Sequence, residues 1–139
     1  NNHMHDAQYY SVFSDAVAGF LEHIDFSTDY RHSQDVTIFN VEAHISYLKE
    51  LLLHDAFYIK IHIYNYDAKR IHLFLTMFNA NNERTATYEA MMMGVNNHTR
   101  SSTEFPTPIQ EKIKNYFDQQ QHFDAPKQLG HVIQIPQSK

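Results

Sequence analysis

The chain contains no cysteine and no tryptophan, and only three glycines and four prolines among 139 residues. Without cysteine it can form neither a disulfide bond nor a thiolate nucleophile, and it offers zinc no cysteine ligand. Because glycine and proline are scarce, we expect the loops to be short or built from Asn, Asp and His. Lys and Arg number 11 against 16 Asp and Glu, and the net charge of −5 excludes a broad basic surface for nucleic acid or an anionic membrane.

No stretch is apolar for long enough to span a membrane, and the first residues lack the charged and apolar regions of a signal peptide. We therefore expect a cytoplasmic protein without a membrane partner. A chain of 139 residues that is 42% hydrophobic can bury one sizeable core and is too short for two. Residues 1–139 are expected to form a single domain.

A polar segment at the start of the chain, residues 1–6, leads directly into a predicted helix. Apolar residues recur from there at helical spacing to about Ile24, namely Val12, Phe13, Ala16, Val17, Phe20, Leu21 and Ile24. Asp6 precedes this run and is the predicted N-cap. The N–H groups of a first helical turn have no partners within the helix, so this polar elbow is suited to holding an anion or polarising a carbonyl.

Alternating residues predict an antiparallel sheet downstream of the helix. Residues 25–35 lose periodicity and are predicted as a connecting loop. Strands are predicted over residues 37–47, 57–66 and 70–78, followed by a last strand that contains Ala86, Tyr88 and Ala90. In the first strand, the residues expected on the buried face are Thr37, Phe39, Val41, Ala43, Ile45 and Tyr47.

Two tight hairpins connect these strands, with turns at Asp67-Ala68-Lys69 and at Asn81-Asn82. In the first hairpin we expect Tyr66 opposite Arg70, Ile63 opposite Leu73, Ile61 opposite Leu75 and Ile59 opposite Met77. In the second we expect Ala80 opposite Glu83, which sets Met77, Leu75 and Leu73 opposite Ala86, Tyr88 and Ala90. The small alanines would let a helix lie close to the sheet.

The end of the chain is predicted to hold one more helix. Residues 96–108 are expected to be mainly loop, and Thr107-Pro108 begins a helix that continues to about Gln121. Residues 123–139 form a tail with a short apolar segment that contains Val132, Ile133 and Ile135. This segment is either an edge strand or a surface that docks on a partner chain.

Helix, long antiparallel strands and a final helix make an α+β layout in which a curved sheet wraps one helix. The motifs within it are Asn1-Asn2-His3-Met4-His5-Asp6-Ala7-Gln8-Tyr9, Val12-Phe13-Ser14-Asp15-Ala16, Asp67-Ala68-Lys69-Arg70-Ile71-His72-Leu73-Phe74, and Thr99-Arg100-Ser101-Ser102 with Pro106. In these motifs, over roughly residues 1–113, the chain resembles the hotdog-fold acyl-CoA thioesterases of the 4-hydroxybenzoyl-CoA thioesterase type. It resembles most of all the betainyl-CoA thioesterase-like proteins of carnitine catabolism.

This resemblance implies an enzyme that hydrolyses an acyl-CoA thioester to a free acid and coenzyme A without a cofactor. Betainyl-CoA or a related short acyl-CoA is the implied substrate. The family elbow has Gly and Asn where this chain has Asn2 and His5. Relatives also place a first strand and a catalytic Asp just before the elbow, upstream of Asn1. If such an Asp is lost, the alternative is a hotdog protein that binds an acyl thioester without hydrolysing it or acts as a structural partner.

Thioester hydrolysis requires a stabiliser for the oxyanion and a group that activates water. The start of the helix can supply the first. His3, Asn2 and Asp6 are the candidate catalytic residues, with His3 the candidate general acid or base, although His3 could equally only shape the loop. Asp15 falls among apolar helix positions and is expected to be a hydrogen-bonded structural residue.

The candidate substrate-binding residues are Tyr9, Lys69, Arg70 and Arg100. The three basic residues could hold the phosphates of coenzyme A, or they could be ordinary surface charges. A trimethylammonium group would favour aromatic faces, which Tyr9, Tyr10, Phe13 and Tyr47 could provide. His3 and His5 at a spacing of two do not make a metal site, so no metal is expected.

A curved sheet with a helix on one face leaves unpaired backbone groups at its edges. Hotdog relatives cover such an edge by joining the sheets of two subunits. We therefore expect a homodimer or a homotetramer, in which the elbow of one chain faces its partner.

Overall fold

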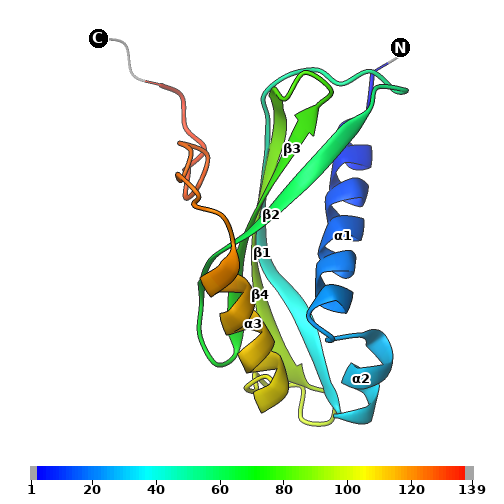
Figure 1. The fold of residues 1–139 in the computed structure, drawn as a ribbon, viewed down its shortest axis with the longest axis vertical. Coiled ribbons are helices and arrows are strands. Elements are labelled where there is room, and N and C mark those ends of the chain that lie inside the picture. The colour runs from blue at the N-terminus through cyan, green and yellow to red at the C-terminus, as the bar shows by residue number, and fades with distance from the viewer. Residues whose placement is uncertain (1–2, 137–139) are drawn as a thin grey trace.

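A helix of 18 residues, α1 (Asp6–His23), lies along one face of a four-stranded antiparallel sheet (Figure 1). The strands are β1 (Val36–Tyr47), β2 (Phe57–Tyr66), β3 (Arg70–Asn79) and β4 (Arg84–Asn96), in the order β1-β4-β3-β2, and two further helices are α2 (Thr28–Ser33) and α3 (Thr107–Gln119). This computed structural model describes residues 3–136, so the candidate Asn2 lies outside the described residues. The predicted α+β hotdog layout, with a C-terminal helix, is confirmed.

The spacing of apolar residues in α1 determines which of its faces meets the sheet. The buried side chains are Tyr9, Phe13, Val17, Phe20 and Leu21, which recur every three or four residues. Each such side chain contributes about 1.5–3 kcal/mol when it is fully buried. The helix predicted to end near Ile24 is therefore confirmed, and hydrophobic burial holds it against the sheet.

Two expectations for this helix are wrong. The N-cap is His5 rather than Asp6, because His5 keeps an extended backbone (φ −71°, ψ 151°) and Asp6 is already helical. Asp15 is exposed rather than set among the buried positions. At about 100° per residue it points roughly 200° around the helix from Phe13, whose side chain faces the core.

The register of β2, β3 and β4 agrees with the pairing predicted from alternation. Ile63, Ile61 and Ile59 lie opposite Leu73, Leu75 and Met77, which in turn lie opposite Ala90, Tyr88 and Ala86. The predictions fail only beside the turns, where bulges shift the register. Tyr66 pairs with Ile71 rather than with Arg70. In the second hairpin the last pair is Phe78 with Arg84, and the predicted pair of Ala80 with Glu83 does not form.

A β-bulge in β1 overturns the first half of its predicted face pattern. The register against β4 shifts between Asn40 and Glu42, so Val41 is an extra residue on this strand. Before the bulge, Ile38 packs against the core, whereas Phe39 and Val41 are exposed. Strict alternation cannot anticipate an inserted residue, and it therefore placed Thr37, Phe39 and Val41 on the wrong face.

The second half of β1 follows the prediction. Ala43, Ile45 and Tyr47 lie opposite Ala90, Tyr88 and Ala86 on the face that meets α1. Ile45 packs against the core, and the ring of Tyr47 meets the ring of Tyr9 edge to face. This half of the strand therefore ends beside the start of α1.

The connecting loop predicted over residues 25–35 contains the short helix α2, so that prediction is wrong in part. The Ser27 hydroxyl caps α2 by accepting a hydrogen bond from the Tyr30 N–H at 3.2 Å. None of the helices within residues 3–136 combines the length and apolarity that a membrane crossing requires.

The helix α3 begins at Thr107 as predicted, and side chains at its C-terminal end form hydrogen bonds with the outer edge of β2. Tyr116 Oη donates to the Ile61 carbonyl at 2.7 Å. The side-chain amide of Gln120 accepts from the Ile63 N–H at 2.9 Å and donates to the Ile63 carbonyl at 2.8 Å. These bonds satisfy backbone groups at one edge of the sheet. In the part of the chain that the structure describes, no strand pairs with the outer edge of β1 at the other side.

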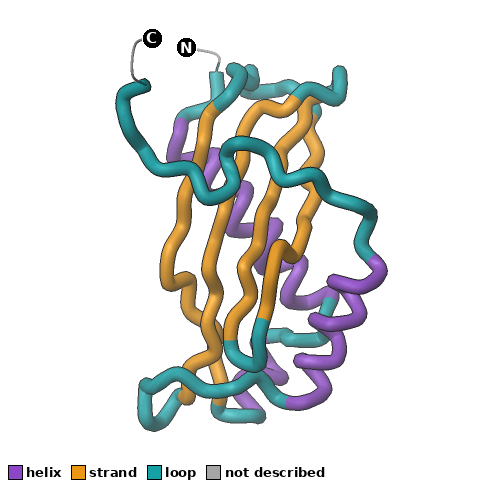
Figure 2. Tube along the Cα trace, turned by 90° about the vertical axis from the view of Figure 1, so that its left-hand side faces the viewer, coloured by secondary structure: helices purple, strands orange, loops and turns teal. Residues whose placement is uncertain are grey.

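Residues 122–136 run across the face of the sheet that lies away from α1 (Figure 2). No strand forms within this segment, so the edge-strand interpretation of Val132, Ile133 and Ile135 is wrong for the isolated chain. Docking of the same residues on a partner chain stays a prediction.

Candidate active site

The polar elbow is held against the connection between β1 and β2 by backbone pairing. His3 forms an isolated antiparallel bridge with Leu52, and the Met4 N–H donates to the Leu51 carbonyl at 2.9 Å. His5 then begins the helix, and its N–H donates to Gln8 Oε1 at 2.7 Å. These bonds fix the direction in which the elbow enters α1, and His3 keeps a partly exposed side chain.

His3 has a carboxylate neighbour that the sequence did not reveal. Its Nδ1 lies 3.7 Å from Glu50 Oε1, within ion-pair range but longer than a hydrogen bond. Glu50 belongs to the connection between β1 and β2, 47 positions away in the sequence. A carboxylate that faces one ring nitrogen of a histidine can orient the ring. His3 and Glu50 are therefore a candidate acid-base pair.

Asp6 lies at the start of α1, where the partial positive charge of a helix favours a carboxylate. Its Oδ1 accepts a hydrogen bond from the Ala7 N–H at 3.2 Å, and its carbonyl accepts one from the Tyr47 hydroxyl at 3.3 Å. The carboxylate is exposed, so it can turn away and free the Ala7 N–H for another acceptor. The first turn can thus present an N–H group to a developing oxyanion.

Aromatic rings line the first half of α1 where it faces β1 and β4. Tyr9 meets Tyr47 edge to face with ring centroids 5.3 Å apart, and Phe13 stacks on Tyr88 at 5.3 Å. Tyr10 meets Tyr88 at 6.1 Å. Tyr10 and Tyr47 are about half exposed, so part of this aromatic cluster is open to a ligand.

Tyr9, a candidate substrate-binding residue, is buried and already has a backbone partner. Its hydroxyl accepts a hydrogen bond from the Leu51 N–H at 3.1 Å. Burial raises the pKa of the Tyr9 phenol, and burial likewise raises the pKa of the Tyr88 phenol. Both phenols stay protonated at neutral pH, so they can stack and donate hydrogen bonds but do not act as bases.

Asn40 joins this cluster because of the β1 bulge. Its Nδ2 donates to the Tyr88 hydroxyl at 2.7 Å, which satisfies a phenol that is only 2% exposed. Alternation had placed Asn40 on the polar face, away from the helix. The signal that could have found this pair is Tyr88 itself, since a tyrosine on a buried face requires a polar partner.

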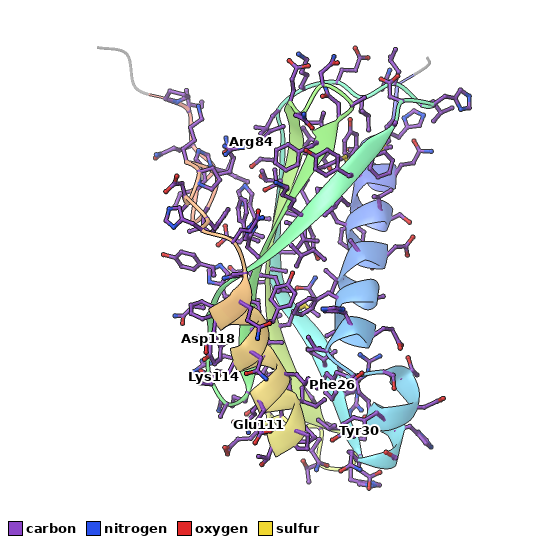
Figure 3. The ribbon with its side chains drawn as sticks, viewed as in Figure 1. Phe26, Tyr30, Arg84, Glu111, Lys114 and Asp118 are labelled. Atoms are coloured by element: carbon purple, nitrogen blue, oxygen red, sulfur yellow. The ribbon has the colours of Figure 1, made fainter. Side chains whose placement is uncertain are left out.

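The three basic candidates lie at the opposite end of the molecule from the elbow. The β2–β3 turn that carries Lys69 packs beside Phe105, since the Ala68 carbonyl accepts from the Phe105 N–H at 2.9 Å. Phe105 in turn meets Phe26, which follows α1 and lies at the lower end of the molecule in Figure 3. The 18 residues of α1, about 27 Å at 1.5 Å per residue, separate this end from His3. The structure therefore does not bring the predicted site residues together within one chain.

The basic candidates differ in how free they are to bind a ligand. Arg70 is committed to Asp67, with its Nε 2.8 Å and its Nη2 2.6 Å from Asp67 Oδ2. Burial alone would raise the pKa of Asp67, but hydrogen bonds from Arg70 and Lys69 outweigh it and lower that pKa. Arg100 lies over the ring of Phe39 at 5.3 Å and is exposed. Lys69 and Arg100 are thus better placed than Arg70 to meet a phosphate.

Within residues 3–136, no group of three or more His, Asp or Glu side chains is placed to hold a metal ion. The arrangement offers instead a histidine beside a carboxylate, a helix start and partly open aromatic rings, which are the groups that polarise a carbonyl and activate water.

Known proteins share this fold and much of this sequence. A hypothetical protein from Staphylococcus aureus, solved in complex with CoA, is 45% identical, and the match has a TM-score of 0.96 over 98% of this chain and 86% of that chain. An L-carnitine dehydrogenase/betainyl-CoA thioesterase from Rhizobium sp is 30% identical over 134 residues, which make up 96% of this chain but 27% of that protein. The chain thus spans about a quarter of the length of that curated relative.

A betainyl-CoA thioesterase from Pseudomonas aeruginosa is 23% identical over 98% of this chain and 86% of its own length. The family model of the thioesterase-like superfamily matches residues 1–113, which include the elbow, α1 and the whole sheet. The resemblance inferred from the motifs is confirmed, and the chain belongs to the thioesterase-like superfamily.

Proposed function

We propose that the protein hydrolyses acyl-CoA thioesters. Water adds to the thioester carbonyl, the carbon–sulfur bond breaks, and the products are a carboxylic acid and the free thiol of coenzyme A. The observation that carries this proposal is the elbow, in which a partly exposed histidine stands beside the start of a helix in a member of the thioesterase-like superfamily. The CoA complex of the Staphylococcus aureus relative supports coenzyme A as the carrier of the acyl group.

In this proposal the first turn of α1 stabilises the oxyanion and His3 accepts the proton of the attacking water. Glu50 orients the His3 ring and stabilises the imidazolium that forms. Asp6 holds the helix start until substrate enters, when its carboxylate releases the Ala7 N–H. Asn2, which lies outside the described residues, stays a candidate catalytic residue.

The acyl group we propose is short and cationic, as in betainyl-CoA. The names of the Rhizobium and Pseudomonas relatives support this choice. The exposed faces of Tyr10 and Tyr47 lie close to the elbow and can surround a trimethylammonium group. Since acyl-CoA thioesters are made and used inside the cell, the cytoplasm remains the expected location.

The catalytic unit we propose is a homodimer, or a homotetramer built from it, in which β1 pairs antiparallel with β1 of a second copy. The outer edge of β1 is unpaired within residues 3–136 and open to such a strand. One end of β1 reaches the elbow, where Tyr47 bonds Asp6, and its other end pairs with Asn96 near Arg100. Within one chain, Arg100 and the elbow are separated by about 27 Å, the length of α1. A two-fold axis instead brings Arg100 of the partner subunit toward the elbow.

Removing the charge of Arg100 or Lys69 should weaken substrate binding if these residues hold coenzyme A phosphates. We expect Arg100→Ala to raise KM about tenfold at low salt, because charge-assisted hydrogen bonds are worth about 1.5–3 kcal/mol, and we expect a smaller rise for Lys69→Ala. Both effects should shrink as salt is added. KM is measured by thiol release from an acyl-CoA at two ionic strengths.

Lys114→Ala is the matched control, since Lys114 is an exposed lysine on α3 paired with Asp118 (Figure 3). Arg70→Ala should lower stability rather than change KM, because Arg70 is bound to Asp67. Unchanged KM values in the Arg100 and Lys69 variants would remove both residues from the binding site.

A further inference from the structure

The C-terminal segment, residues 122–136, makes its first contacts near the edge of the sheet that is opposite β1. The ring of Phe123 stacks on His62 of β2 with centroids 4.3 Å apart. It also lies 5.5 Å from the ring of Phe74 of β3, a side chain with no exposed surface. The segment therefore covers an apolar part of the sheet as it begins to cross.

The same segment then crosses β4 and leaves the sheet over β1. The Gly130 N–H donates to Glu89 Oε1 of β4 at 2.7 Å, and Glu89 Oε2 lies 2.6 Å from His72 Nε2. The next residue, His131, meets the ring of His44 of β1 at 6.0 Å. With contacts on β2, β3, β4 and β1, the segment spans the full width of the sheet (Figure 2).

Beyond this crossing lies an arm, residues 132–136, whose aliphatic side chains have almost no cover. Val132, Ile133 and Ile135 are 69%, 84% and 90% exposed. The strand over which the arm leaves carries two more exposed apolar side chains, Phe39 and Val41, at 43% and 55%. Apolar surface gathered on both sides of a free sheet edge is typical of a protein–protein contact.

The arm is too short to cover Phe39 of its own chain. Phe39 lies five positions before His44 on the same strand, which is roughly 16 Å at about 3.3 Å per residue. Ile133 and Ile135 follow His131 by two and four residues, which span about 7 Å and about 14 Å at most. Arg100 of the same chain lies over the Phe39 ring at 5.3 Å, and the part of the ring that stays exposed is open to a second copy.

We propose that the arm packs against Phe39 of the partner subunit in the β1-paired dimer. The inference rests on the proposed dimer. When two copies of β1 pair antiparallel along their full length, Val36 lies opposite Tyr47 of the partner subunit, and His44 lies opposite Phe39 of the partner subunit. The arm leaves the sheet at His44, so the two-fold axis places Ile133 and Ile135 over the exposed face of that phenylalanine. The dimer thereby contains two arm contacts, one made by each subunit.

The absence of cysteine from the chain allows a direct test by disulfide trapping. Full-length subunits with Phe39→Cys are mixed with differently tagged subunits with Ile133→Cys and are oxidised. We expect a disulfide-linked dimer that contains both tags on a non-reducing gel. Leu53→Cys replaces Phe39→Cys in the control, because Leu53 is exposed to a similar extent, 45%, on the connection between β1 and β2. That control should give no mixed product with Ile133→Cys.

A second measurement separates this proposal from the dimer on which it rests. The double variant Ile133→Ser with Ile135→Ser should weaken dimerisation at least about tenfold in sedimentation, since each buried isoleucine favours association. If the natural protein is a dimer but neither trapping nor the serine variant has an effect, the arm is not part of the interface, and the β1 pairing stands. If the natural protein is a monomer at micromolar concentration, the dimer and the arm contact are both wrong.

Discussion

Replacing His3 with alanine should lower kcat about 10²-fold, the scale of a single general acid or base, while KM changes little. The effect falls on kcat because His3 takes a proton that is in motion only in the transition state. His3 is suited to this role because its side chain is partly exposed and its Nδ1 faces Glu50 at 3.7 Å. Steady-state thiol release from an acyl-CoA gives both constants.

His54→Ala is the matched control for this variant, since His54 is an exposed histidine on the connection that pairs with the elbow. Its kcat should stay at the natural value. If His3→Ala keeps the kcat of the unsubstituted protein, His3 only shapes the elbow, and a carboxylate activates the water instead. Glu50→Gln tests the supporting role separately and should lower kcat by less than His3→Ala does, because it removes the carboxylate beside the ring and leaves the imidazole in place.

Replacing Phe13 with alanine should reduce the free energy of unfolding by about 3–5 kcal/mol, a large share of the roughly 5–15 kcal/mol that holds a domain folded. The Phe13 side chain has no exposed surface and stacks on Tyr88 with ring planes 14° apart. Its loss leaves a cavity between α1 and β4 at the point where the helix supports the aromatic cluster. Urea unfolding followed by circular dichroism measures the change.

Ser14→Ala is the control for Phe13, because Ser14 is the next residue of the same helix and is exposed. It should change the free energy of unfolding by less than about 0.5 kcal/mol. A loss below about 1 kcal/mol in Phe13→Ala would show that α1 is not anchored through this ring.

The register of β2, β3 and β4 could be predicted because it depends on neighbours along the chain. Short turns join these strands, and the alternation of Ile59, Ile61 and Ile63 admits one pairing that keeps every apolar side chain on the buried face. In contrast, β2 and β3 lie between β1 and its partner β4 in the sequence, so no short turn sets the register of this pair. Its bulge at Val41 depends on contacts with distant residues, and no local pattern reports it.

The same reasoning explains which parts of the candidate site could be found. His3 and Asp6 belong to one contiguous motif, and the start of a helix is visible in the spacing of apolar residues. Glu50, Asn40 and Tyr88 reach the site from other elements, so their roles depend on tertiary contacts. The charge of Arg100 makes it a candidate, but no local pattern reports that it lies at the end of the molecule opposite the elbow.

Thiol release by the purified full-length protein is the most direct test of acyl-CoA hydrolysis. It is measured with betainyl-CoA and with 3,3-dimethylbutyryl-CoA, which has the same shape and no positive charge. We expect one free thiol and one free acid per thioester from both, with kcat/KM about tenfold higher for betainyl-CoA because of cation–π contact with the open tyrosine faces. Binding of either thioester without release of thiol would contradict the account and favour a hotdog protein that holds acyl-CoA without hydrolysing it.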